Sequence, residues 1–257
     1  MKFESQGRPL SDDGMDRICR TLGVAEPEVW AILTVETRGF GFLRNRRPQI
    51  LFERHIFHRL TDGQHDAGNR DISNARPGGY VGGAAEYDRL KKAMTLDRGA
   101  ALQSASWGIG QVMGMNFQVA GYDDVEAMVD DMVRNEDAQL LAMANFIRGN
   151  RLDSALQRHN WVSFARGYNG PAFKVNEYDT RLAAAHAKFS TLLPDLALRT
   201  AQAALNYLGI NPGPIDGLRG RRTRSALIEF QNRRDLPETG ELDSDTGSRL
   251  IAEAFPD

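Results

Sequence analysis

The stretch ILTVETRGFGF, residues 32–42, sets the interpretation of the N-terminal part of the chain. Its apolar residues predict the last turns of a helix that begins near residue 26, where a proline at the first helical position is tolerated. We expect Gly39 to be the C-cap. Glu36 then lies in the last turn of an otherwise apolar helix.

Two physical effects favour the protonated form of Glu36. The residues three, four and seven positions before it are all apolar: Leu33, Ile32 and Val29. Burial and the negative end of the helix dipole both disfavour a carboxylate at this place. A protonated glutamate is what a glycosidase needs to donate a proton to a leaving sugar oxygen. The alternative is a glutamate that simply reaches solvent at a helix end.

Composition excludes several other classes of function. The 257 residues are enough for one large domain or two, and the net charge of −2 argues against attraction of the whole protein to nucleic acid. No apolar run follows the N-terminal lysine, so we expect no signal peptide, and no run has the length of a membrane span. We expect a monomer that acts without a cofactor.

Cysteine and histidine usage gives no sign of a disulfide or a metal site. Cys19 is the single cysteine, which excludes an internal disulfide, and its helical spacing predicts a core position. The five histidines form no recognisable metal-binding motif, and His55 and His58 lack an obvious third ligand. We therefore expect no metal site.

The sequence predicts a mainly α-helical fold. Helices are expected at 11–22, 123–133, 135–148 and 177–192, and the one strand expected is at 49–53. Residues 61–83 form a long Gly- and Asn-rich loop, and such loops are often functional. Glycines at 108, 110 and 114 imply close approach of the backbone to a helix or a ligand. Pro194 divides a domain at 1–194 from a compact module of three short helices at 195–257.

The C-terminal module resembles a known family. Residues 201–210 read AQAALNYLGI and residues 213–217 read GPIDG, and the pattern continues through Thr223, Phe230 and Thr246. This pattern is similar to the peptidoglycan-binding module of cell-wall hydrolases. The resemblance covers nearly all of 197–252 and implies that peptidoglycan is the partner. Arg234 to Leu236 departs from the family, which often has a glycine there, but the departure affects only a turn.

The N-terminal part resembles the phage N-acetylmuramidases of lysozyme-like fold over roughly residues 10–190. Four motifs carry the resemblance, in the expected order: VETRGFGF at 35–42, ILFERH at 50–55, SWGIGQVMG at 106–114 and GYNG at 167–170. A looser similarity extends to lytic transglycosylases and goose-type lysozyme. The implied fold is a lysozyme-like α+β catalytic domain with little strand.

The resemblance assigns roles to particular residues. Glu36 would be the general acid, and Glu53 either a base for water, an orienting group or simply the ion-pair partner of a neighbouring arginine such as Arg54. Gln111, Tyr168 and Asn169 would line the cleft. Trp107 would either stack on a sugar ring or be a core indole.

The expected activity is hydrolysis of the β-1,4 bond between N-acetylmuramic acid and N-acetylglucosamine. A separation of roughly 6.5–9.5 Å between Glu36 and a second carboxylate would favour inversion, and roughly 5–5.5 Å a covalent intermediate. Two alternatives stay open: a lytic transglycosylase, and a non-catalytic wall-binding protein of a virion or secretion machine. As a phage lysin, the protein would be made in the host cytoplasm and would reach the periplasmic wall with the help of a holin.

Overall fold

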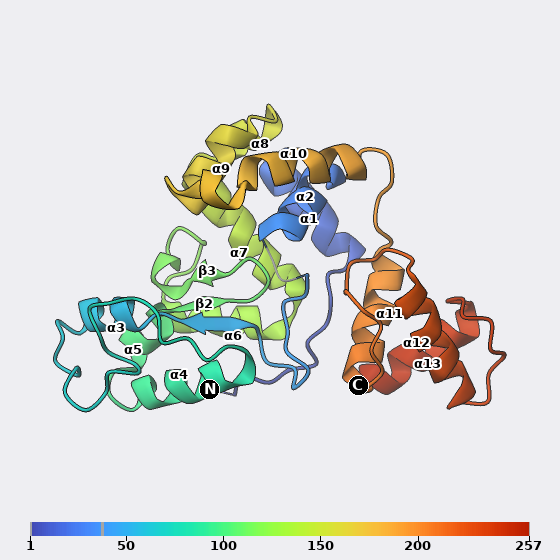
Figure 1. Cartoon of the computed structure of the whole chain (residues 1–257), viewed down its shortest axis with the longest axis horizontal. Coiled ribbons are helices and arrows are strands. Elements are labelled where there is room, and N and C mark those ends of the chain that lie inside the picture. Colours follow the sequence, from blue (N-terminus) through green and yellow to red (C-terminus); the bar gives the residue numbers. More distant parts are fainter. Residues whose placement is uncertain (1, 37–38, 257) are drawn as a thin grey trace.

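The computed structural model describes residues 2–36 and 39–256, except for the side chain of Glu36. The fold is mainly α-helical with one small antiparallel sheet, as the sequence predicts (Figure 1). The helices of the N-terminal part are α1 (Asp12–Leu22), α2 (Glu26–Glu36), α3 (Arg54–Leu60), η1 (Gly83–Ala85), α4 (Glu86–Met94), α5 (Arg98–Gln103), η2 (Gly114–Asn116), α6 (Val125–Arg134), α7 (Glu136–Gly149), α8 (Asp153–Gln157), α9 (Trp161–Asn169), η3 (Phe173–Asn176) and α10 (Tyr178–Phe189). The C-terminal helices are α11 (Leu196–Tyr207), α12 (Arg221–Asn232) and α13 (Ser244–Ala254).

Local sequence signals locate α1 almost to the residue. Ser11 is its N-cap and accepts the N–H of Gly14 at 3.0 Å, so the first turn is capped by a side chain. Gly23, with φ of 66°, ends the helix in the left-handed region. The helix expected at 11–22 is confirmed, with its first helical residue one position later.

Helix α2 lies inside the N-terminal domain, packed between α1 and α10 (Figure 1). Its apolar side chains, those of Val29, Ile32, Leu33 and Val35, are all buried. The contact with α10 is the most extensive between any two elements of the described chain. Burial on several sides explains why α2 is apolar around most of its circumference.

The sheet has the order β1–β2–β3, formed by β1 (Ile50–Phe52), β2 (Ala105–Trp107) and β3 (Val112–Met113). Only β1 is expected from the sequence. The other two strands are three and two residues long, which is too short for a period of two to be recognised. Together they form a hairpin within the glycine-rich stretch 104–116.

The pairing register gives the sheet two different faces. Leu51 lies opposite Ser106 and Ile50 lies opposite Trp107, so paired residues point to the same side. Ile50, Phe52 and Trp107 point into the core and are at most 5% exposed. Alternation therefore places Ser106 and, just beyond β1, Glu53 on the other face.

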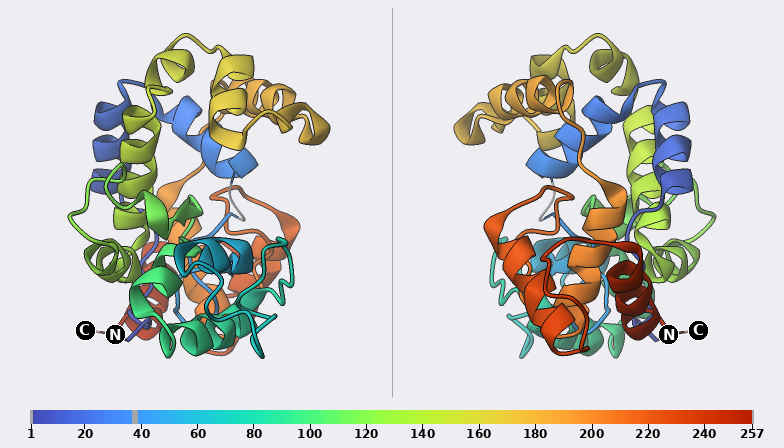
Figure 2. Two further views of the ribbon diagram at one scale, coloured as in Figure 1. Left: turned by 90° about the vertical axis from the view of Figure 1, so that its left-hand side faces the viewer. Right: turned by 90° about the vertical axis from the view of Figure 1, so that its right-hand side faces the viewer.

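Two large apolar clusters lie on either side of the linker at 190–195. One contains buried residues between Phe3 and Phe189, and the other contains buried residues between Ala201 and Phe255. A third, small cluster of Phe40, Phe42 and Ala203 joins residues from both parts. Helix α11 thus packs against the N-terminal domain through Ala203, and in Figure 2 the C-terminal helices lie behind (left) and in front of (right) the lower part of that domain.

The centre of this interface is a buried ion pair between Glu136, the first residue of α7, and Arg199 of α11. Glu136 is 0% exposed and Arg199 is 1% exposed. Both guanidinium Nη atoms donate to the Glu136 carboxylate, one of them at 2.9 Å. The remaining lone pairs of Glu136 accept the N–H groups of Leu10 at 2.8 Å and Gly41 at 2.7 Å. The charge of the buried Glu136 is therefore compensated by four hydrogen bonds.

The N-terminal segment also contacts the C-terminal helices. The hydroxyl of Tyr207 donates to the carbonyl of Gly7 at 2.8 Å, and Arg46 donates to the carbonyl of Ala254 at 2.6 Å. Gln6 donates to the carbonyl of Pro256 at 2.5 Å, so the segment around Gln6 contacts the end of the described chain. Among the described helices, none is both long enough and apolar enough to cross a membrane.

We predict that Arg199→Met destabilises the protein by about 3–5 kcal/mol, because Glu136 would be left as a buried charge without its partner. Urea unfolding followed by circular dichroism measures this loss. Arg20→Met is the control: its pair with Asp16 spans 4.0 Å and both side chains are more than 70% exposed, so less than about 1 kcal/mol should be lost. Equal losses in the two variants would contradict the structural role of Arg199.

Candidate active site

Helix α2 ends at Glu36, and its apolar surroundings are those expected from the sequence. Val29 and Ile32 are 0% exposed and Leu33 is 4% exposed. The side chain of Glu36 lies outside the described residues, so its protonation and its role stay predictions. Gly39 has φ of +85°, a conformation that favours glycine. Residues 37–38 lie outside the described residues, so its role as the C-cap of α2 stays a prediction.

The second predicted carboxylate, Glu53, lies at the junction of β1 and α3. It is the N-cap residue of α3, and its own N–H donates to the carbonyl of Ser104 at 2.8 Å. Its side chain is 17% exposed and lies on the face of the sheet opposite the core. Glu53 is therefore held by backbone contacts at a fixed place on that face.

Two side chains contact the Glu53 carboxylate. The hydroxyl of Tyr80 donates to its two oxygens at 3.0 and 2.9 Å. The Nδ1 atom of His55 lies 3.2 Å from Oε2. Arg54, the neighbour considered as an ion-pair partner, donates instead to the carbonyls of the 61–83 loop. Among the described residues, the Glu53 carboxylate is therefore hydrogen-bonded to Tyr80 and lies beside His55, and it is not paired with Arg54.

Tyr80 contacts the predicted carboxylate Glu53 but was not predicted from the sequence, although it lies in the 61–83 loop, a type of loop that is often functional. Partial burial and the hydrogen bond to Glu53 raise the pKa of Tyr80, so the phenol stays protonated and can donate. The loop is ordered by Arg54 and Arg89, which donate to its carbonyls, and by Glu86, which accepts the N–H groups of Val81 and Gly82. No local motif signals this arrangement, because Tyr80 and Glu53 are 27 positions apart.

Gln111 lies in the turn of the β2–β3 hairpin, where it has φ of +47°. Its amide nitrogen donates to the carbonyl of Gly108 at 2.8 Å, and its amide oxygen accepts from the hydroxyl of Ser106 at 2.9 Å. These bonds fix the shape of the turn. Gln111 thus stabilises the turn on this face of the sheet.

Tyr168, in the last turn of α9, contacts the same turn. Its hydroxyl donates to the carbonyl of Gly110 at 3.1 Å, and its ring stacks on Phe164 with 5.6 Å between the centroids. Asn169, the last residue of α9, is half-buried. The structure therefore brings Gln111 and Tyr168 together at the turn of residues 108–111. This turn belongs to the β2–β3 hairpin, and β2 pairs with β1, the strand that leads to Glu53.

The glycines of this hairpin approach neighbouring helices rather than open space. A Cβ atom at Gly108 would lie 2.5 Å from the Gln139 side chain, and one at Gly110 would lie 2.8 Å from Cβ of Met143, both on α7. At Gly114 it would lie 2.1 Å from the carbonyl oxygen of Leu102 on α5. Helix packing thus accounts for all three glycines.

Trp107 belongs to the core and not to a sugar-binding surface. It is 0% exposed, its indole N–H donates to the carbonyl of Leu102 at 3.1 Å, and it stacks on Phe3. The sugar-stacking interpretation is therefore corrected in favour of the core indole. The physical reason is strand alternation, which turns Trp107 inward and its neighbour Ser106 outward.

Comparison with known families agrees with this geometry. The N-acetylmuramidase family model matches residues 25–190, which include α2, the sheet and α9. The chain belongs to the N-acetylmuramidase family. The protein is thus a glycoside hydrolase of the lysozyme type, with a peptidoglycan binding domain matched at residues 195–250.

A solved structure supports the family assignment. The crystal structure of a Burkholderia AP3 phage endolysin is similar to this muramidase, with a TM-score of 0.68 and 39% sequence identity. The match covers 72% of this chain and 72% of that one. No curated protein matches the chain. Together with the matched domains, the likeness makes the protein a peptidoglycan hydrolase.

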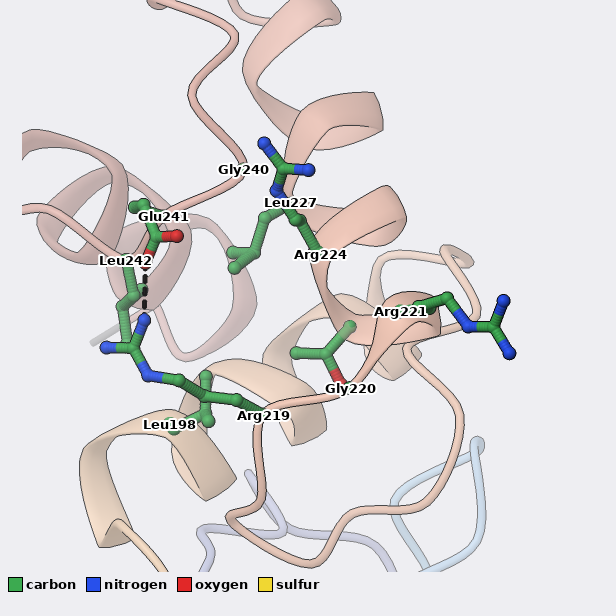
Figure 3. Close-up of a pocket in the computed structure, with 10 residues that line it drawn as sticks. Leu198, Arg219, Gly220, Arg221, Arg224, Leu227, Gly240, Glu241 and Leu242 are labelled. Atoms are coloured by element: carbon green, nitrogen blue, oxygen red, sulfur yellow. Dashed lines mark hydrogen bonds and ion pairs between the residues drawn. The ribbon is translucent and has the colours of Figure 1, made fainter.

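The peptidoglycan binding domain contains a pocket of about 270 Å³ (Figure 3). Leu198 and Leu227 contribute apolar walls from α11 and α12. Arg219 and Glu241 form an ion pair at its edge, and Arg224 lies on the helix above it. An apolar pocket edged by arginines suits a ligand that combines an apolar part with carboxylates.

We predict that Tyr80→Phe lowers kcat/KM on purified peptidoglycan by about tenfold, because Glu53 loses a charge-assisted hydrogen bond worth about 1.4 kcal/mol. The rate of turbidity loss of a sacculus suspension measures it. Tyr122→Phe is the matched control, since the Tyr122 hydroxyl donates at 2.8 Å to another carboxylate, Asp131, near α6. Activity that falls equally in both variants would show a general packing effect instead.

Proposed function

We propose that this muramidase is an endolysin that hydrolyses the β-1,4 bond between N-acetylmuramic acid and N-acetylglucosamine, with Glu36 as the general acid. The observation that carries the proposal is that α2, whose apolar residues from Val29 to Val35 are buried, ends in a glutamate within the matched family region. The carboxyl group of Glu36 would protonate the bridging oxygen as an oxocarbenium-like state develops.

Glu53 is proposed as the second carboxylate of the reaction. It lies on the face of the sheet opposite the core, and Tyr80 and His55 limit the positions of its two oxygens. A fixed carboxylate at this place would activate or orient the attacking water. Tyr80 is proposed as its positioning residue.

The remaining predicted residues are proposed to form the wall of the cleft. Gln111 and Tyr168 fix the turn at 108–111, and Asn169 ends the helix that packs beside it. Amide groups there would serve the N-acetyl and hydroxyl groups of the glycan.

Two domains with separate roles are proposed, with residues 1–194 cleaving the glycan and residues 195–257 binding the wall. The separate apolar clusters on each side of the linker support this division. Likeness to a phage endolysin supports a lysin that is made in the host cytoplasm as a monomer and reaches the wall through a holin.

Glu36→Gln should abolish lysis while the fold and thermal stability stay unchanged, because the amide keeps the shape of the side chain and cannot donate the required proton. The assay is turbidity loss of permeabilised cells. Glu26→Gln is the matched control at the other end of α2, where Glu26 accepts from the Trp30 indole at 3.2 Å. A fully active Glu36→Gln variant would refute the assignment.

The products of the wild-type enzyme identify the reaction. Mass spectrometry of digested sacculi should show reducing N-acetylmuramic acid ends, formed when water attacks. Anhydro-muramic ends would instead identify a lytic transglycosylase, in which the 6-hydroxyl of the sugar replaces water.

Arg224→Glu should weaken binding to intact sacculi by about tenfold, or about 1.4 kcal/mol, because it reverses a charge beside the pocket of the peptidoglycan binding domain. Co-sedimentation with sacculi measures binding, and cleavage of soluble glycan fragments should continue at the wild-type rate. Arg233→Glu, just after α12 and outside the pocket, controls for net charge. Equal weakening by both changes would point to general electrostatics.

A further inference from the structure

A second cluster of chemically active side chains lies at the end of α2 opposite Glu36. Glu28 is in the first turn of α2, His159 follows α8, and His186 is in the last turn of α10. Nε2 of His159 lies 2.6 Å from Oε1 of Glu28, and Nε2 of His186 lies 3.0 Å from the same oxygen. Two imidazoles from distant parts of the chain therefore point at one carboxylate.

Burial makes this arrangement unusual for a simple ion pair. Glu28 is 7% exposed, and its second oxygen, Oε2, is buried without a hydrogen-bond partner in the described chain. A buried carboxylate oxygen without a partner is unfavourable. A positively charged group at the cluster would compensate it.

The two histidine rings are held in their orientation by packing. The ring of Trp161 lies 5.4 Å from that of His159, nearly parallel to it, and 5.3 Å from that of His186. The histidine rings themselves are 4.2 Å apart. His159 adopts φ of +53°, a left-handed conformation that is uncommon for a residue other than glycine. The donor atoms are thus directed by contacts outside the cluster.

We propose that Glu28, His159 and His186 form a binding site for a divalent transition-metal ion such as Zn²⁺. Their three ligand atoms lie within 4.8 Å of one another. Two imidazole nitrogens and one carboxylate oxygen are a donor set that Zn²⁺ prefers. The His159 side chain is 45% exposed, which leaves one side of the cluster open for a water as the fourth ligand.

The geometry requires only a small adjustment. Ligand atoms about 2.0–2.1 Å from a tetrahedral zinc ion are roughly 3.3 Å apart. The nitrogen–oxygen distances of 2.6 Å for His159 and 3.0 Å for His186 would therefore increase by roughly 0.7 and 0.3 Å. The partly exposed His159 can move to allow this. The bound ion would replace the protons that these groups share, and both histidines would coordinate in their neutral form.

The proposed ion would join α2, the turn after α8 and α10. Its role would be structural, because Glu28 precedes Glu36 by eight residues, or about 12 Å along a helix. The ion would stabilise the packing of α2 against α10 at the end of the helix away from the proposed general acid.

Isothermal titration of the tag-free, metal-stripped full chain with ZnCl₂ tests the proposal. We expect one saturable site per chain and a rise in Tm of about 5 °C at a Zn²⁺ concentration of ~100 Kd. CoCl₂ should give the visible absorption bands of a tetrahedral Co²⁺ complex. Glu28→Gln and His159→Ala should each weaken the affinity at least tenfold, with circular dichroism confirming that the variants are folded.

His58→Ala is the matched control. His58 Nδ1 lies 2.9 Å from Asp66, so this pair resembles the cluster but supplies only two ligand residues. The variant should bind Zn²⁺ as the wild type does. The proposal is wrong if no saturable binding occurs, if Glu28→Gln and His159→Ala bind with wild-type affinity, or if His58→Ala removes the site.

Discussion

The buried carboxylate of Glu136 is the constraint on which the arrangement of the two domains depends. A charge removed from water is tolerated only when it is paired and its lone pairs accept hydrogen bonds. Glu136 meets this condition with four donors from three segments: the N–H groups of Leu10 and Gly41 and both Nη atoms of Arg199. The N-terminal segment, the chain after α2 and the C-terminal module must therefore all take up their places for the charge to be compensated.

This requirement links the C-terminal module to α2. Arg199 also donates to the carbonyl of Gly39 at 2.9 Å, so α11 contacts the segment by which the chain leaves α2. At its other end, α2 contributes Glu28 to the cluster with His159 and His186. The helix that carries Glu36 is thus apolar in its middle and bound by charged groups near both ends.

Several features of the site could be predicted because they are local. The start of α1, the burial of Val29 and Ile32, and the strand before Glu53 follow from capping, helical periodicity and β-propensity. The hairpin at 105–113 was missed because its strands are too short for any period, and Tyr80 because it lies in a loop far from Glu53 in sequence. The ambiguity of Trp107 could be resolved only by the pairing register, which decides the face of the sheet that each residue occupies.

The sequence by itself determined the mainly helical fold class, the resemblance to muramidases and the identity of the residues proposed to perform the chemistry. These depend on short-range patterns within single elements. Only the tertiary structure decided which ionisable groups meet: Glu136 with Arg199 across 63 positions, and Glu28 with His159 and His186 across 131 and 158 positions. No local pattern encodes such pairs, because burial brings them together only after the helices have packed, and buried charges then require those partners.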